Sequence, residues 1–252
     1  MRNFLSSKFQ VYDTRYFVYT YNNNSIRIVK HKFCRKSGYE ELNKQFSFVD
    51  YNSEEVKRAS ISRTKRNIRE IALCNDFEYF ATLTINCDLC DRYSLDSVQN
   101  NLKKTLKMIK RNNKDFKYIF ITEKHKDGAF HFHGLIGGLS SDLFSINSNG
   151  YLEISIFSDN LGFNSFSKIK DYTKCCNYIT KYITKDCIKN SHNQIYISSR
   201  GLKKATREEF SYIDFNPSFS NDYCDILDIN INDLSRDKLL DLNIQLEKNK
   251  IN

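Results

Sequence analysis

The chain has 252 residues, of which 39 are lysine or arginine and 30 are aspartate or glutamate, so its formal net charge is +9. This length suits one sizeable domain with appendages, and the basic excess favours a polyanionic partner such as nucleic acid. There is no apolar run of the roughly 18–20 residues that cross a membrane, and no apolar export signal at the start, so we expect a cytoplasmic protein with no membrane partner and reduced cysteines.

The first part of the chain is expected to form a β-hairpin followed by a basic helix. Residues 8–33 hold two runs of aromatic and β-branched side chains around an Asn-Asn-Asn-Ser turn, a pattern typical of two antiparallel strands. Residues 34–52 are polar and irregular, and residues 53–74 have apolar side chains at helical spacing. This helix is crowded with basic residues, among them Arg63, Lys65, Arg66 and Arg69. Taken alone, it fits a solvated face as well as a phosphate-binding face.

The middle of the chain alternates β-rich runs with helical patterns. We expect a strand over 80–85, a helix over 96–112, and a hairpin of 117–124 with 130–137 around the turn Asp127-Gly128. A strand over 151–157, a helix over 171–189 and a strand over 195–198 are expected to follow. This order predicts an α+β fold, in which helices pack on one face of a central antiparallel sheet in a ferredoxin-like or RRM-like layout.

The end of the chain differs in composition from the middle. From residue 221 onward it is net acidic and carries leucines at the spacing of a short amphipathic helix. We therefore divide the chain into an N-terminal hairpin with a polar connection over 1–52, a central domain over 53–205, and an acidic, partly helical tail over 206–252.

Two histidines flank Phe132 in the second strand of the central hairpin. Successive side chains of a strand point to opposite faces, so His131 and His133 share one face and can form half of a divalent-metal site. Glu123, at the end of the neighbouring strand, would complete a three-ligand site with open positions, and His125 is the competing third ligand. Such a set of oxygen and nitrogen ligands suits Mg²⁺ or Mn²⁺, although His-x-His pairs also occur in structural and zinc sites.

The sequence Tyr-Ile-Thr-Lys occurs twice in succession over residues 178–185. On a helix, Tyr178 and Tyr182 lie one turn apart on one face, and Lys181 and Lys185 form a second pair beside them. A plain amphipathic helix has the same pattern. Next to a metal site, however, a tyrosinate can attack a DNA phosphodiester and become linked to the 5′ phosphate, while a lysine stabilises the developing charge. A second tyrosine permits a second transfer.

Three motifs in this order resemble those of the HUH endonuclease superfamily, and within it the paired-tyrosine rolling-circle replication initiators of plasmids and single-stranded DNA phages. The first motif is the Phe-Ala-Thr-Leu-Thr run over 80–84, the second is the His-Phe-His run over 131–133, and the third is the tyrosine repeat over 178–185. The stretches 63–75 and 196–204 are also similar to such initiators, so the resemblance covers residues 55–205.

The resemblance implies an HUH nuclease that nicks and joins single-stranded or hairpin origin DNA through a 5′-phosphotyrosine, leaving a free 3′ hydroxyl. It would do so with Mg²⁺ or Mn²⁺ in the cytoplasm of a bacterial host. Because the chain has no Gly-x-x-x-x-Gly-Lys motor motif, host helicase and polymerase would be its partners. The nucleophiles would be Tyr178 and Tyr182, assisted by Lys181 and Lys185, and the metal ligands would be His131, His133 and Glu123.

With DNA as the substrate, two basic segments become candidates for contacts to phosphates. They are Arg63, Lys65, Arg66 and Arg69 in the first helix, and Arg200, Lys203 and Lys204 after the last predicted strand. Two other functions stay open. One is a relaxase or single-strand transposase with the same chemistry, and the other is a non-catalytic DNA-binding repressor.

Overall fold

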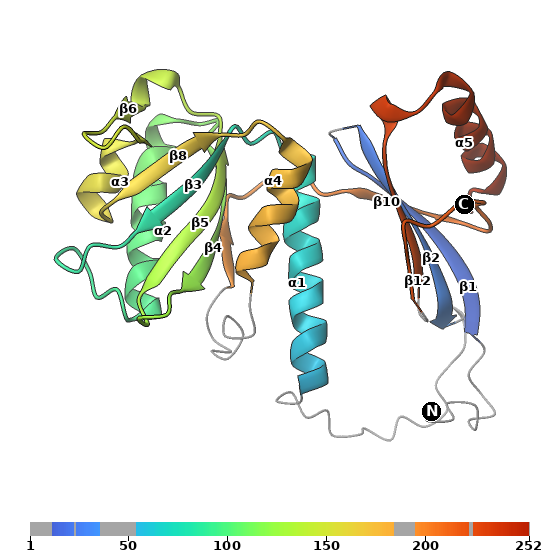
Figure 1. Ribbon diagram of the computed structural model, residues 1–252, viewed down its shortest axis with the longest axis horizontal. Coiled ribbons are helices and arrows are strands. Elements are labelled where there is room, and N and C mark those ends of the chain that lie inside the picture. The colour runs from blue at the N-terminus through green and yellow to red at the C-terminus, as the bar shows by residue number, and fades with distance from the viewer. Residues whose placement is uncertain (1–11, 23, 36–53, 184–194, 222–223, 252) are drawn as a thin grey trace. The chain divides into compact units, whose positions relative to one another are not determined.

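The computed structural model of the chain describes residues 12–22, 24–35, 54–183, 195–221 and 224–251 (Figure 1). They form an α+β fold with two antiparallel sheets, in agreement with the predicted class. The chain divides into two units, one over residues 50–203 and the other made of residues 1–49 and 204–252. Within the described ranges, no helix is long and apolar enough to cross a membrane.

The larger unit is built on a seven-stranded sheet in the order β6-β7-β8-β3-β5-β4-β9 (Figure 1). Its strands are β3 (Tyr79–Thr84), β4 (Lys117–Lys124), β5 (Phe130–Gly137), β6 (Ser145–Ile146), β7 (Leu152–Glu153), β8 (Asn164–Lys168) and β9 (Tyr196–Ser198). The hairpin of β4 and β5 has the predicted bounds. Consequently the strand that carries the two histidines lies in the interior of the sheet, between β3 and β4.

One face of this sheet is covered by α2 (Leu95–Asn112) and the short helix α3 (Ser155–Asn160). Ser94 caps α2 by accepting a hydrogen bond from the Ser97 amide. The buried side of α2, including Leu102 and Leu106, packs on side chains of the strands such as Leu83 and Phe132 in one core. Burying each of these large apolar side chains contributes about 1.5–3 kcal/mol. This core fixes the strands, and the opposite face of the sheet remains for the histidines.

The helix α4 (Tyr172–Ile179) and the 3-10 turn η2 (Thr180–Tyr182) lie against the histidine-bearing face. Strand alternation places Phe80 on that face, and its ring lies 5.8 Å from the ring of Tyr178 and 6.4 Å from that of Tyr182, centroid to centroid. Helices therefore lie on both faces of the sheet, which adds to the layout expected from the sequence.

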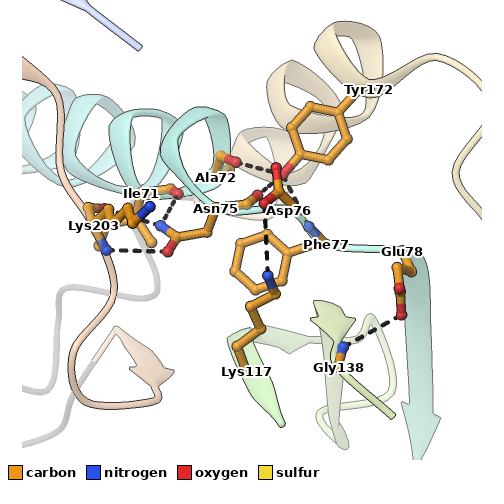
Figure 2. A network of polar contacts seen from close by, with 10 residues as sticks. All are labelled: Ile71, Ala72, Asn75, Asp76, Phe77, Glu78, Lys117, Gly138, Tyr172 and Lys203. Atoms are coloured by element: carbon orange, nitrogen blue, oxygen red, sulfur yellow. Dashed lines mark hydrogen bonds and ion pairs between the residues drawn. The ribbon is translucent and has the colours of Figure 1, made fainter. Parts of the chain in front are cut away.

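The long helix α1 (Glu54–Cys74) lies beside α4, and polar contacts hold the two together (Figure 1). Figure 2 shows the hydroxyl of Tyr172 within hydrogen-bond reach of the carbonyl oxygens of Ala72, at 2.7 Å, and Asn75. The same hydroxyl accepts from the amide of Phe77 at 3.2 Å. Burial raises the pKa of Tyr172 far above its ordinary value, so the phenol keeps its proton and remains a donor. The first residue of α4 is thereby fixed to the junction of α1 and β3.

Asn75 at the same junction also holds the segment that follows β9. Its side-chain amide donates to the carbonyl oxygens of Ile71, at 2.7 Å, and Lys203, at 2.9 Å (Figure 2). The Lys203 amide donates back to the side-chain oxygen of Asn75 at 3.1 Å. One buried asparagine therefore positions the end of the larger unit.

The smaller unit is a five-stranded sheet in the order β10-β1-β2-β12-β11. Its elements are β1 (Tyr12–Thr20), β2 (Ser25–Arg35), β10 (Thr206–Phe210), β11 (Phe219–Ser220), β12 (Cys224–Asn230) and α5 (Arg236–Asn249). The predicted N-terminal hairpin is present as β1 and β2. The sequence assigned 1–52 and 206–252 to separate segments, whereas the structure pairs β10 with β1 and β12 with β2. A two-stranded hairpin is marginal by itself, and the added strands and α5 cover its apolar face.

Two predicted elements of the larger unit differ from the structure. The strand expected over 151–157 is wrong beyond Glu153, because Ile154, Phe157 and Leu161 are buried at helical spacing along α3. The side chain of Asn164 accepts from the amide of Ile154 at 2.9 Å and so holds the start of this helix. The helix expected over 171–189 is α4 up to Ile179 and then η2, and residues 184–194 lie outside the described residues. Two further 3-10 turns are η1 (Ser141–Leu143) and η4 (Ile231–Asp233).

Candidate functional site

The strand β5 places His131 and His133 on one face, opposite two threonines of β3. The hydroxyl of Thr82 lies 3.4 Å from Nδ1 of His133, and that of Thr84 lies 3.3 Å from Nδ1 of His131. The antiparallel register pairs each histidine with one threonine, so both rings are oriented in the same way. These contacts engage Nδ1 and leave Nε2 of each ring for another partner.

The two candidates for a third ligand lie beside different histidines. Oε2 of Glu123 is 2.8 Å from Nε2 of His133. The exposed ring of His125 lies 5.1 Å from the ring of His131, and its Nδ1 is 3.4 Å from a carboxylate oxygen of Asp127. The structure therefore pairs Glu123 with His133 and His125 with His131.

Both predicted tyrosines lie beside the histidine pair. The ring of Tyr182 stacks on that of His133, with centroids 3.8 Å apart and an angle of 13° between the ring planes. The hydroxyl of Tyr182 donates to that of Tyr178 at 3.0 Å, and their rings are nearly perpendicular, at 87°. One phenol is thus in contact with a histidine, and its hydroxyl is within hydrogen-bond reach of the other.

The two phenols have different surroundings. Tyr178 is 45% exposed, and the ammonium of Lys181 lies 4.9 Å from its ring centroid, in cation–π range. Tyr182 is partly buried, and burial, followed by its hydrogen bond to Tyr178, raises the pKa of Tyr182 well above its usual value. Tyr178 is therefore the more accessible oxygen. Lys185, the other predicted assisting residue, lies outside the described residues.

Burial lowers the pKa of both His131 and His133 below the ordinary value of 6.5. At His133 the carboxylate of Glu123 opposes this effect without cancelling it. Both imidazoles are therefore neutral at neutral pH, which is the form that binds a metal.

This shift predicts a pH-dependent stability for the metal-free protein. In the unfolded chain the two histidines titrate near 6.5, whereas in the folded protein they titrate lower. Below pH 6.5 the unfolded state therefore binds protons that the folded state does not, so the free energy of unfolding should fall as the pH drops from about 7 to 5. Urea denaturation in EDTA at a series of pH values measures this slope. The double variant His131→Asn with His133→Asn should have a flatter slope over that window, and an unchanged slope would contradict the assignment.

The predicted metal ligands are only partly gathered. Neighbouring ligands of an octahedral ion with bonds of about 2.1 Å lie about 3 Å apart, and the 2.8 Å between His133 Nε2 and Glu123 Oε2 matches that spacing. Their nitrogen and carboxylate oxygen also suit Mn²⁺ or Mg²⁺. Over the described part of the chain, however, no three His, Cys, Asp or Glu side chains are close enough together to hold one ion. His133 and Glu123 fit a metal as a pair, and His131 is not placed as their third partner.

The basic residues of α1 have different roles. Arg63 and Arg66 are exposed, with Arg66 4.0 Å from the carboxylate of Glu70, and Lys65 is half-buried. Nε of Arg69 donates to the side-chain oxygen of Asn177 in α4 at 2.8 Å. Arg69 therefore contributes to the packing of the tyrosine-bearing helix, whereas the exposed arginines are available to a phosphate backbone.

The second basic segment is exposed at Arg200, Lys203 and Lys204. Arg200 and Lys203 belong to the larger unit, and Lys204 is the first residue of the second part of the smaller unit. The main chain of Lys203 is fixed by Asn75, which leaves its side chain exposed.

Sequence reasoning missed the residues that hold α4 in place. Asn177 receives the hydrogen bond from Arg69, and Tyr172 contacts the end of α1. Both are polar residues in an amphipathic helix, where the expected position is solvent-exposed. No local pattern distinguishes them, because their partners come from a helix far away in the sequence.

No curated protein and no solved structure matches the chain. Residues 78–187 match the model of a family described as replication-associated protein, the family that includes ORF2. This stretch holds the histidine pair, Glu123 and both tyrosines. The central part of the chain is thus similar to replication-associated proteins, a similarity consistent with a rolling-circle replication initiator.

Proposed function

We propose that the protein is a rolling-circle replication initiator that nicks and rejoins single-stranded or hairpin origin DNA through a 5′-phosphotyrosine. The observation that carries the proposal is the stacking of Tyr182 on His133, with Tyr178 hydrogen-bonded to Tyr182. A plain amphipathic helix does not require its phenols to meet a histidine pair. The match of residues 78–187 to replication-associated proteins supports the same reading.

In the proposed reaction the oxygen of Tyr178 attacks the scissile phosphorus first, because this phenol is the more exposed of the two. The new bond joins this oxygen to phosphorus, and the bond from phosphorus to the 3′ oxygen breaks. The phenol proton passes to solvent, and the leaving oxygen takes a proton from solvent to become the 3′ hydroxyl. Lys181 stabilises the charge that develops near Tyr178. Tyr182, 3.0 Å from Tyr178, is positioned for the second transfer.

The proposed cofactor is Mg²⁺ or Mn²⁺, held by His133 and Glu123, with His131 as a further ligand. Such an ion polarises the scissile phosphate and fixes its geometry when bound. Thr82 and Thr84 hold the two rings so that Nε2 remains for this purpose. The exposed basic residues of α1 and of the segment after β9 would bind the DNA backbone. Host helicase and polymerase in a bacterial cytoplasm would act on the nicked product.

The test is the covalent intermediate itself. Full-length protein is incubated with single-stranded DNA of the replicon that encodes it, with Mn²⁺ or with EDTA, and analysed under denaturing conditions. We expect an adduct only with the metal, mapped by mass spectrometry to Tyr178 or Tyr182. DNA binding without an adduct under any metal would overturn the nuclease and favour a non-catalytic repressor.

A further inference from the structure

The loop over residues 85–94 joins β3 to α2, and hydrogen bonds fix its shape next to the histidine-bearing strand. The carboxylate of Asp91 accepts from the amide of Tyr93 at 2.9 Å. The amide of Phe130, the first residue of β5, donates to the carbonyl oxygen of Arg92 at 2.9 Å. The loop is thereby attached to the central hairpin and presents Tyr93 beside it.

The ring of Tyr93 is both exposed and held in place. It is 55% exposed, although a large aromatic side chain on a soluble surface costs solvation. Nη2 of Arg92 donates to its hydroxyl at 2.9 Å, and the guanidinium carbon lies 5.1 Å from the ring centroid. Its edge lies against the hairpin turn at Gly128, where an added Cβ would be 3.7 Å from the ring. The ring is therefore ordered without being buried.

A continuous series of contacts connects this ring to the candidate site. Arg92 lies 3.6 Å from the carboxylate of Asp127, which is 3.4 Å from Nδ1 of His125. The ring of His125 in turn lies beside that of His131. Tyr93 is thus at the border of the histidine pair, on the side of the hairpin tip, and none of the proposed chemistry uses it.

The charges around Tyr93 are mixed. Lys124 and Lys126 on the hairpin are exposed, as are the carboxylates of Asp88 and Asp91 in the loop. Arg92 lies near Asp127, and the latter also accepts from the Ala129 amide at 3.0 Å. A surface of this kind does not attract phosphates as strongly as a uniform basic patch would. The contribution that it can make is stacking, which depends on the face of an aromatic ring.

We propose that Tyr93 is a stacking platform for one base of single-stranded DNA bound across the histidine pair. This inference rests on the proposed function, because it places the base in the strand whose phosphate reaches His133. Arg92 holds the ring and lends its cation to the base edge or the adjoining phosphate. Unpaired bases expose their faces whereas paired bases do not, so the platform selects single strands. Because every base has an aromatic face, the platform contributes affinity with little sequence preference.

The test measures binding of a fluorescent 12-nucleotide oligothymidine to the full chain by anisotropy, in EDTA so that no cleavage occurs. Tyr93→Ala should weaken binding about 5- to 100-fold, the usual effect of losing one base stack. Tyr93→Phe keeps the ring and should bind within about twofold of the unchanged protein. The matched control is Tyr151→Ala, because Tyr151 is 53% exposed in the same unit and also contacts one aromatic ring, that of Phe163. This control should bind like the unchanged protein.

A second measurement needs no variant. Oligonucleotides with 5-iodouracil should photocrosslink to Tyr93, as located by peptide mass spectrometry. Equal affinities of Tyr93→Ala and Tyr151→Ala, without a crosslink at Tyr93, would overturn the platform even if the covalent adduct forms. Conversely, Tyr93-dependent binding in a protein that never forms the adduct would support the platform and overturn the nuclease. No binding of single-stranded DNA at all would overturn both.

Discussion

Tyr178→Phe combined with Tyr182→Phe should lower formation of the covalent protein–DNA adduct by on the order of 10⁴-fold or more, because it removes every proposed nucleophile. Phenylalanine keeps both rings, so the stack of residue 182 on His133 and the contacts of residue 178 with Phe80 persist. The loss would then report the hydroxyls and not the packing of α4. Adduct formation under single-turnover conditions in Mn²⁺ measures it, and Tyr151→Phe is the control that should leave the rate unchanged.

The two single substitutions should have unequal effects on the first cleavage. Tyr178→Phe removes the more exposed oxygen, next to Lys181, and should lower the rate strongly. Tyr182→Phe removes only a hydrogen-bond donor to Tyr178 and should reduce the first cleavage modestly, while blocking the second transfer. If Tyr182→Phe alone abolished the first cleavage, Tyr182 would be the first nucleophile. If either single change abolished both steps, a scheme with one tyrosine would replace the alternating scheme.

The parts of the site that could be predicted from the sequence are those set by local geometry. The turn at Asp127-Gly128 fixes the hairpin of β4 and β5, and strand alternation then places His131 and His133 on one face. Glu123 follows from the same register, since it lies across from His131. Spacing of four residues on a helix correctly indicated that the two phenols lie close together.

Features that depend on contacts between distant segments could not be predicted. Nothing local indicates that Arg69 and Asn177 meet, or that the ring of Tyr182 lies on His133. The smaller unit is a further example, because β1 and β10 pair although most of the chain lies between them. The failure over 151–157 has another cause. A short apolar run has no clear period, and burial of Phe157 against the core favours a helix there.

His133→Ala should lower the metal-dependent rate of adduct formation on the order of 10³-fold, because a bound ion supplies several kcal/mol of stabilisation to phosphoryl chemistry. His133 has the most contacts of the candidate ligands, with Glu123, Thr82 and Tyr182. Glu123→Gln should raise the Mn²⁺ concentration for half-maximal rate, since the amide keeps the shape of the side chain but loses the charge that binds the ion. EDTA should reduce the unchanged protein to the level of His133→Ala.

The matched control is His125→Ala, which removes an exposed imidazole next to His131 and Asp127. If His133 and Glu123 are the metal pair, this variant should keep the Mn²⁺ midpoint of the unchanged protein, and calorimetric titration with Mn²⁺ should give the same affinity. A raised midpoint for His125→Ala together with an unchanged one for Glu123→Gln would instead assign the metal to His125 and His131. The single 2.8 Å contact between His133 and Glu123 decides our expectation, because no equally close approach joins His125 to His131 among the described contacts.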